Sequence, residues 1–105
     1  MNAVERLWRA LEAGDWASLA AQFGHGAVIE RAGEGRLSAE AYVADARAAG
    51  APESIAVRRM TGDGTIVAVE ATVVRGGVRS RVLAIYDLHD GHLRGGTEAW
   101  VRESR

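Results

Sequence analysis

The stretch TIVAVEATVVRGGVRSRVLAIYDLHDGHLRGGTEAWVR, residues 65–102, consists largely of apolar side chains that alternate with polar ones. A period of two is typical of β-strands, in which successive side chains point to opposite faces of a sheet. The dipeptides GG at 76–77 and DG at 90–91 interrupt this alternation, and both favour tight hairpin turns. The stretch therefore predicts three consecutive antiparallel strands, and residues 55–61 have the pattern of a further strand before them.

The first half of the chain has the period of amphipathic helices instead. Apolar residues recur there every three to four positions, which places them on one helix face. The expected helices cover residues 3–13, the segment from Asp15 to Phe23, and residues 38–49. Gly14 can end the first helix in a left-handed conformation, and Asp15 and Ser38 can cap the next two by accepting hydrogen bonds from free amides. A short apolar run at 24–31 adds one strand.

This order of elements predicts the fold class. Helices followed by a meander of strands indicate an α+β fold in which three N-terminal helices cover one face of an antiparallel sheet. A chain of 105 residues has the size of one domain, so residues 1–105 are expected to fold as a single unit.

Composition narrows the classes of partner. Thirteen basic and fourteen acidic side chains give a net charge of -1, without a basic block for a run of phosphates, so nucleic acid is not expected as a partner. No run approaches the roughly 20 apolar residues of a membrane span, and the charged N-terminus lacks the core of a signal peptide. We therefore expect no membrane association and a cytoplasmic location. The absence of cysteine excludes disulfides and thiolate metal sites.

The order and spacing of four segments resemble the SnoaL-like branch of the nuclear transport factor 2-like superfamily. These segments are LWRALEAGDWASLAAQF, GEGRLSAEAYVADA, DGTIVAVEATV and YDLHDGHLRGGTEAW. The resemblance implies a cone of curved sheet wrapped on a long helix, with a hydrophobic pocket inside and a homodimer through the outer sheet face. Members include polyketide cyclases, ketosteroid isomerases, limonene epoxide hydrolases, dehydratases and non-catalytic binding domains, so the fold alone does not decide the activity.

The register of the last hairpin decides which way Glu98 points. A two-residue turn at Asp90-Gly91 would place Trp100 on a polar face and make Glu98 a surface charge. A three-residue loop from His89 to Gly91, with Gly91 in a bulge, would shift the pairing by one residue and turn both side chains inward.

Side-chain chemistry leaves this choice open, because burying Trp100 favours the three-residue loop and burying Leu93 and Val101 favours the two-residue turn. The resemblance favours the three-residue loop, since the residues of ketosteroid isomerases that match Glu98 and Trp100 face the pocket. In that register Glu98 lies opposite Val82. The inner wall of the sheet is then mostly apolar and includes Val67, Val69, Ala71, Val73, Val82, Ala84, Tyr86 and Leu88.

Glu98 is the first catalytic candidate. A carboxylate on an apolar wall loses hydration, which disfavours its charged form and suits general acid or base work. The alternative is a structural ion pair with Arg31, which alternates with Ala27 and Ile29 on the first strand. Arg31 matches the catalytic base of ketosteroid isomerases, but an arginine stays protonated and cannot act as that base.

The resemblance also argues against two known activities. The tyrosine and the aspartic acid of ketosteroid isomerases match Leu7 and Ala84 here, so that activity is not expected. Limonene epoxide hydrolases need an Asp-Arg-Asp set around a water, of which Arg31 and Glu98 could supply at most two members.

Tyr86 completes the expected catalytic set, because its hydroxyl could bind a substrate carbonyl, although it could also be a core residue with a satisfied hydroxyl. The expected ligand-binding residues are Trp100, Val82, Ala84, Val69, Tyr42 and Phe23. Neither a cofactor nor a metal ion is expected, since the three histidines lack a completing carboxylate other than that of their own turn.

Two functions follow from these residues. The first is an enzyme that binds a hydrophobic polyketide, steroid or terpenoid-like molecule. Glu98 would transfer protons in an isomerisation, cyclisation, dehydration or epoxide opening. Arg31, Tyr86 and Trp100 would orient the ligand. The second is a non-catalytic ligand-binding or dimerisation module in which Glu98 and Arg31 form a buried ion pair. An enzyme needs Glu98 desolvated but unpaired, whereas the module tolerates a tight pair.

Overall fold

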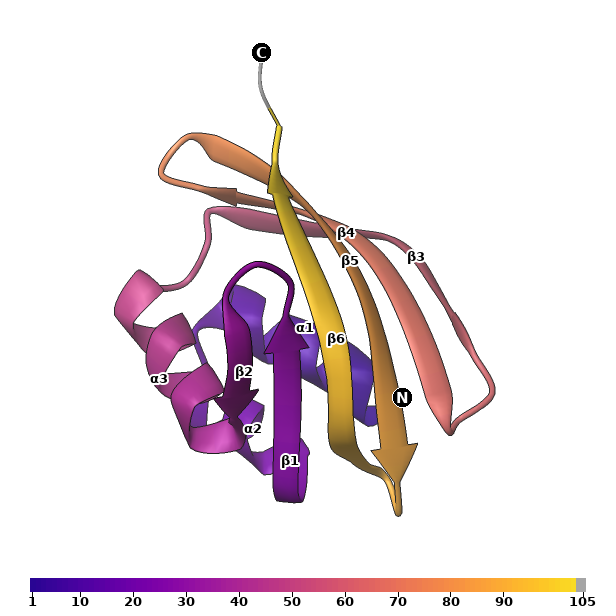
Figure 1. The fold of residues 1–105 in the computed structure, drawn as a ribbon. Coiled ribbons are helices and arrows are strands. Elements are labelled where there is room, and N and C mark those ends of the chain that lie inside the picture. Colours follow the sequence, from indigo (N-terminus) through magenta and orange to yellow (C-terminus); the bar gives the residue numbers. More distant parts are fainter. Residues whose placement is uncertain (104–105) are drawn as a thin grey trace.

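The computed structural model describes residues 1–103 as three helices packed inside a curved six-stranded sheet (Figure 1). The helices are α1 (Ala3–Ala13), α2 (Trp16–Ala21) and α3 (Ala39–Ala49). The strands are β1 (Phe23–Arg31), β2 (Gly35–Ser38), β3 (Ser54–Gly62), β4 (Ile66–Arg75), β5 (Val78–His89) and β6 (His92–Arg102), and their order in the sheet is β2-β1-β6-β5-β4-β3. The predicted α+β class and the three N-terminal helices are confirmed.

The expected caps fix the ends of the helices. Gly14 ends α1 with a φ of 69°, in the left-handed region that glycine adopts at little cost. Asp15 accepts a hydrogen bond from the amide of Ser18 at 3.1 Å, and Ser38 accepts one from the amide of Ala41 at 3.1 Å. Local sequence therefore determines where α1 ends and where α2 and α3 begin.

The second helix is shorter than predicted. It ends at Ala21, and Phe23 is the first residue of β1 instead of the last position of the helix stripe. The carbonyl of Gln22 accepts from the amide of Leu93 at 2.8 Å, so pairing with β6 begins where the helix would have continued. The prediction of Phe23 as a helical residue is wrong because this sheet contact replaces the next helical turn.

The sheet also contains a strand and a pairing that the sequence did not predict. The short strand β2 folds back on β1 as an antiparallel hairpin. The neighbouring pair β1 and β6 runs parallel, so the sheet is mixed instead of wholly antiparallel. Parallel strands need a long connection, and the chain supplies one because β1 and β6 lie at opposite ends of the sequence.

The last hairpin has the turn that the resemblance did not favour. His89 pairs with His92, so Asp90 and Gly91 form a two-residue turn, with φ values of 50° and 76°. Two positive φ values in succession are typical of a type I′ hairpin turn. The predicted three-residue loop is therefore wrong.

A bulge one step further along nevertheless turns Glu98 inward. Leu88 pairs with Leu93, but Asp87 pairs with Gly95, so one residue of β6, Arg94, has no partner on β5. This extra residue shifts the register, as a β-bulge does. Glu98 and Trp100 then lie opposite Ala84 and Val82 on the inner face. The predicted inward orientation of Glu98 and Trp100 is confirmed, and its cause is the bulge. The predicted pairing of Glu98 with Val82 is wrong, because the bulge places Ala84 opposite Glu98.

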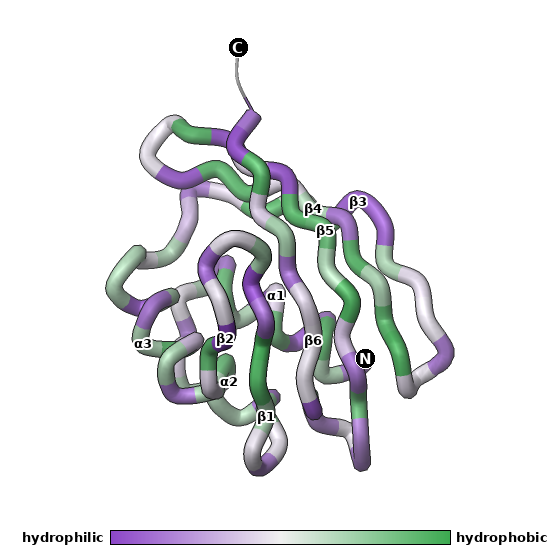
Figure 2. Tube along the Cα trace, viewed as in Figure 1, coloured by the Kyte–Doolittle hydropathy of each residue, from purple (hydrophilic) through white to green (hydrophobic). Residues whose placement is uncertain are grey.

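The bulge allows Leu93 and Trp100 to face the same side of the sheet, although the burial of each favoured a different turn in the sequence. Leu93 is fully buried before the bulge, and Trp100 is partly buried against the core after it, whereas Val101 is 58% exposed. The inner face carries the apolar side chains expected of it, and Figure 2 shows apolar and polar positions alternating along the strands. Among residues 1–103, no helix has the length and apolar character needed to cross a bilayer.

Candidate functional site

Glu98 is the centre of a buried polar cluster. Its side chain has no exposed surface. One carboxylate oxygen, Oε2, accepts hydrogen bonds from the hydroxyls of Tyr42 at 2.7 Å and Tyr86 at 2.6 Å. The other oxygen, Oε1, accepts from the indole N–H of Trp100 at 3.0 Å. These donors come from α3, β5 and β6, so the cluster joins a helix to the sheet.

A glycine makes room for one of these donors. Gly96 lies directly opposite Tyr86 across the β5–β6 pair. A Cβ atom at Gly96 would lie 2.8 Å from Cδ1 of the Tyr86 ring and 2.7 Å from the carbonyl oxygen of Ile85. Side-chain atoms do not approach that closely, so the ring of Tyr86 can cover this position only because it is glycine.

Arg31 is the fourth partner of Glu98. It lies at the end of β1, directly beside Glu98 in the parallel pair, and its side chain is 10% exposed. Nη2 lies 3.6 Å from Oε1 of Glu98, and Nη1 donates to Asp45 of α3 at 2.9 Å. The guanidinium also lies 5.3 Å from the ring centre of Tyr42 and 5.8 Å from that of Trp100, which are cation–π distances.

The charge of the cluster keeps its donors protonated. Burial, followed by the nearby charge of Glu98, raises the pKa of Tyr42 and of Tyr86 well above the usual 10.0. Burial alone would lower the pKa of Arg31, but the hydrogen bond that Arg31 donates to Asp45 and the charge of Glu98 outweigh it and leave that pKa raised. Both phenols and the guanidinium therefore remain hydrogen-bond donors.

A cavity of about 150 Å³ lies against this cluster. Arg31, Tyr42 and Trp100 line it together with Leu11 of α1 and with Ala46 and Ala49 of α3. Glu34, Asp45 and Arg75 complete the lining, whereas Glu98 and Tyr86 do not line it. A molecule in this cavity would lie against Arg31 and Trp100 and would not contact Glu98 or Tyr86.

The structure brings together five of the nine predicted site residues, namely Glu98, Arg31, Tyr86, Trp100 and Tyr42. Three others, Val69, Val82 and Ala84, lie on the inner face as predicted, but they are buried in the hydrophobic core and do not line the cavity over Arg31. The interior of the cone is filled there by side chains.

Phe23 lies apart from the cavity. Its ring packs on that of Tyr42, with centres 5.3 Å apart, and it lines a separate groove of about 710 Å³ between α2, α3 and β1. Phe23 therefore packs on the cluster through Tyr42.

Two residues that contribute to this site, Asp45 and Trp8, were not predicted from the sequence. Asp45 holds Arg31, and it follows Tyr42 by three positions, a spacing that places both on one face of α3. Trp8 stacks on Trp100 at 6.2 Å between ring centres, and its buried indole N–H has no hydrogen-bond partner within residues 1–103. The helical spacing could have indicated Asp45, whereas no local signal indicates the stacking of Trp8.

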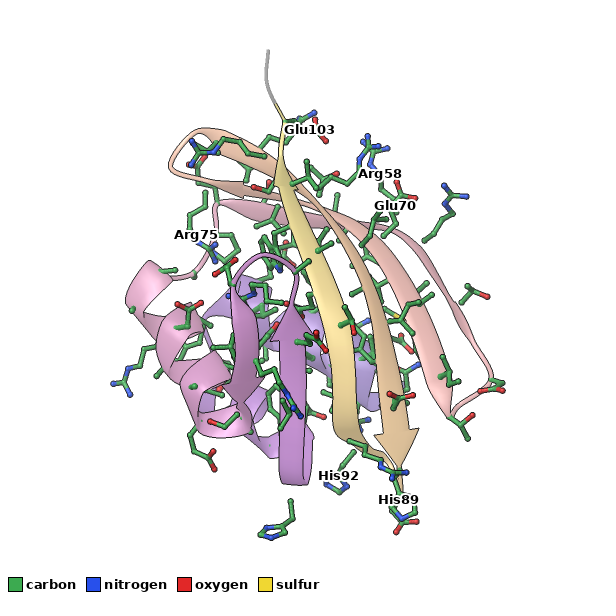
Figure 3. The ribbon with its side chains drawn as sticks, in the orientation of Figure 1. Arg58, Glu70, Arg75, His89, His92 and Glu103 are labelled. Atoms are coloured by element: carbon green, nitrogen blue, oxygen red, sulfur yellow. The ribbon has the colours of Figure 1, made fainter. Side chains whose placement is uncertain are left out.

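His89 and His92 are remote from this site (Figure 3), and His25 lines the separate groove between α2, α3 and β1. Figure 3 shows His89 and His92 at the turn end of the β5–β6 hairpin, at the opposite end of the molecule from Arg75, which lines the cavity. His89 pairs with Asp90 at 3.3 Å. In the part of the chain that the structure describes, no three His, Asp or Glu side chains are grouped so that they could hold a metal ion.

The raised pKa values of the two tyrosines predict how stability depends on pH. The fold favours their protonated form, so this contribution is fully present below the unfolded-state pKa of about 10 and is lost as the pH rises above it. We expect the free energy of unfolding to fall above pH 10 by up to about 1.4 kcal/mol per pH unit for each tyrosine. Urea titrations across this range would measure it.

The absorbance of tyrosinate provides the control for these urea titrations. Tyr42 and Tyr86 are the only two tyrosines of the chain, so tyrosinate absorbance reports on this cluster alone. The absorbance should increase together with the loss of circular dichroism. Tyrosinate that forms near pH 10 in a protein that is still folded would show that the two hydroxyls are not held by Glu98.

Comparison with known proteins identifies the fold and the family of this chain. No curated protein matches the sequence closely enough to count as a relative. Solved structures match the fold at low sequence identity. An NTF-2 like protein of unknown function from Burkholderia xenovorans LB400 is 21% identical, with a TM-score of 0.87, over 98% of this chain and 83% of the other. A putative ketosteroid isomerase from Kribbella flavida DSM 17836 is 18% identical, with a TM-score of 0.85, over 98% and 78%.

An epoxide hydrolase of M. tuberculosis, described as LEH-like, is 21% identical, with a TM-score of 0.74, over 93% of this chain and 79% of the other. At these identities the likeness concerns the fold alone. The family comparison is more specific, because residues 4–95, most of the chain, match the SnoaL-like domain. The chain therefore belongs to the SnoaL-like domain family, within the nuclear transport factor 2-like fold.

Proposed function

We propose that this protein binds a compact small molecule in the cavity over Arg31, and that Glu98 is the fixed counter-charge of Arg31 instead of a proton carrier. The observation that carries this proposal is the saturation of Glu98, which has three hydrogen bonds, an ion-pair partner and no exposed surface. A general acid or base must reach the atom that it protonates or deprotonates. Glu98 does not line the cavity, which supports the binding module over the enzyme.

The size of the cavity limits the ligand. Pockets for drug-sized ligands have volumes of about 300–1,000 Å³, whereas this one has about 150 Å³. A cavity of about 150 Å³ in another protein holds a benzene molecule. The part of the ligand that lies inside this recess is therefore of about that size, and a larger molecule would extend past the exposed side chains of Glu34 and Asp45 into solvent.

A catalytic role for Glu98 is the second candidate, and one distance favours it. Arg31 Nη2 is 3.6 Å from Oε1, so that oxygen accepts only one short hydrogen bond, from Trp100. A ligand that displaced Arg31 would meet a desolvated carboxylate able to serve in isomerisation, dehydration, aldol cyclisation or epoxide opening. A ketosteroid isomerase and an epoxide hydrolase among proteins of this fold are consistent with that chemistry.

Filling the cavity tests the binding proposal. Ala49 lines the cavity and the adjacent exposed residue, Ala48, does not. Phenol at a concentration near its Kd should raise the Tm of the wild type and of Ala48→Met by about 2–3 °C, because it binds only the folded state. Ala49→Met should show no such shift, since the methionine occupies the ligand's space. Equal Tm shifts in all three proteins, measured by thermal unfolding, would show that phenol binds outside this cavity.

We also propose a homodimer through the outer sheet face. Leu83, Ile85 and Val101 are 53%, 55% and 58% exposed there. Ala68, Leu83, Ile85, Thr97 and Ala99 line a hollow of about 470 Å³ on this face. Exposed apolar patches of this kind are typical of interaction sites, and homodimer interfaces are more apolar than the remaining surface. Glu70 of β4, on the outer side of the sheet in Figure 3, also lines this hollow and forms an ion pair with Arg59 of β3 at 2.8 Å, so one edge of the hollow is charged.

A charge placed in the hollow tests the dimer. The wild type should have twice the chain mass of 11.2 kDa in light scattering at micromolar concentration. Leu83→Arg should give a monomer, because an arginine would be buried without a partner in the interface. Val78→Arg, at an exposed position of the same strand that does not line the hollow, should leave the mass unchanged. A dimeric Leu83→Arg variant would exclude this face as the interface.

A further inference from the structure

The outward side chains of β5 carry opposite charges at the two ends of an apolar centre. Alternate residues of this strand point away from the helices, and in chain order they are Arg79, Arg81, Leu83, Ile85 and Asp87. All five are exposed. Within residues 1–103, Asp87 has no ion-pair partner, and Arg81 has only Glu103, at 3.6 Å. No short contact in this part of the chain therefore neutralises either end of the row.

The hollow on the outer sheet face has the same centre as this charge pattern. Four inward residues form one row across the sheet from β3 to β6, namely Met60, Val69, Ala84 and Glu98. In each of these strands, the two residues that flank the row line the hollow. They are Arg59 and Thr61, Ala68 and Glu70, Leu83 and Ile85, and Thr97 and Ala99. The hollow and the charges of β5 are therefore both centred on the row through Ala84.

A second copy of this chain fits this shared centre. In a dimer with twofold symmetry, every contact between two different residues occurs twice, once in each direction. A twofold axis along the row through Ala84 would place the two β5 strands antiparallel to each other. Leu83 would then lie over Ile85 of the partner subunit, and Arg81 would lie over the partner's Asp87. Apolar side chains would meet apolar ones, and opposite charges would meet at both ends.

The other orientations lack this complementarity. Packed sheets lie nearly aligned or nearly orthogonal, and an aligned dimer can have its twofold axis across β5 or along it. An axis along β5 would place Arg81 over the partner's Arg81 and Asp87 over the partner's Asp87, and like charges face to face are unfavourable in an interface. In an orthogonal dimer the two strands would cross at the hollow, so their charged ends would not meet. The charges of β5 therefore favour the antiparallel arrangement.

We propose that two copies of this chain pack antiparallel through the outer sheet face, about a twofold axis along the row through Ala84, and that Arg81 and Asp87 form two reciprocal ion pairs that fix this orientation. In the dimer, Arg81 turns from Glu103, 3.6 Å away in its own chain, to the partner's Asp87. This inference rests on the proposed homodimer. It names the geometry of that interface and the two residues that select it.

A mixing experiment tests the orientation without changing the net charge. The double variant with Arg81→Asp and Asp87→Arg exchanges the two charges, so it should dimerise with itself as the wild type does. A mixed dimer of this variant and the wild type would oppose like charges at both contacts. In native mass spectrometry of isotope-labelled wild type mixed with the unlabelled double variant, mixed dimers should therefore fall from the statistical half to about one tenth or less. Labelled and unlabelled wild type, the control, should give the statistical half. A mixed fraction of one half or more with the double variant would overturn the inference.

Single substitutions give a second measurement with a matched control. Arg81→Asp should raise the Kd of the dimer by about a hundredfold, because it opposes like charges at two contacts, and adding Asp87→Arg should restore the wild-type Kd. Arg79→Asp makes the same change of charge one outward position along β5, where the antiparallel partner has no acidic residue opposite. It should change the Kd by less than about fivefold, as expected for an exposed charge. Equal effects of Arg81→Asp and Arg79→Asp in analytical ultracentrifugation would show that net charge governs association and would contradict the proposed ion pair.

The antiparallel orientation and the proposed homodimer fail in different ways. A wild-type mass of one chain, 11.2 kDa, in light scattering would exclude the homodimer and the orientation with it. If the wild type is a dimer, Leu83→Arg is a monomer and mixed dimers with the double variant form freely, the interface stands and the orientation is wrong. Arg81 and Asp87 are both exposed, so the exchanged charges should leave the fold intact, which circular dichroism of each variant checks.

Discussion

The burial of one carboxylate is the constraint on which the site depends. A charged group with no exposed surface needs hydrogen-bond donors and an opposite charge, because the cost of removing it from water is large. Glu98 obtains these from Tyr42, Tyr86, Trp100 and Arg31, which lie on α3, β5, β6 and β1. Three of these partners, Arg31, Tyr42 and Trp100, also line the cavity, so the interactions that satisfy Glu98 position part of its wall.

A single extra residue in β6 makes that burial compatible with the rest of the core. Without the bulge at Arg94, the two-residue turn would place Glu98 and Trp100 on the same face as the outward side chains of β5. With it, Leu93 before the bulge and Glu98 after it both face the helices. The polar cluster and the apolar core can therefore share one face of the sheet.

Local signals in the sequence predicted the caps of the helices and the strands from β3 to β6, because caps, turns and alternation depend on neighbouring residues. The inward direction of Glu98 was predicted from the family resemblance, since local side-chain chemistry left it open. The bulge was not predictable, since Gly95 and Gly96 follow it and carry no side chains that could reveal a shift in the alternation. The parallel β1–β6 pair and the saturation of Glu98 by Tyr42 and Tyr86 depend on contacts between distant segments. Residue identity alone could not separate a free catalytic carboxylate from a fully bonded one.

Paired substitutions of two acidic partners of Arg31 test the central claim most directly. Glu98→Gln and Glu34→Gln remove the same charge, but Glu98 has no exposed surface, whereas Glu34 is 60% exposed and 3.7 Å from Arg31. In urea unfolding, Glu98→Gln should lower the free energy of unfolding by about 3–5 kcal/mol, as breaking a buried ion pair does. Glu34→Gln should change it by less than about 0.5 kcal/mol. A Glu98→Gln variant as stable as Glu34→Gln would contradict the structural role of Glu98 and favour the catalytic one.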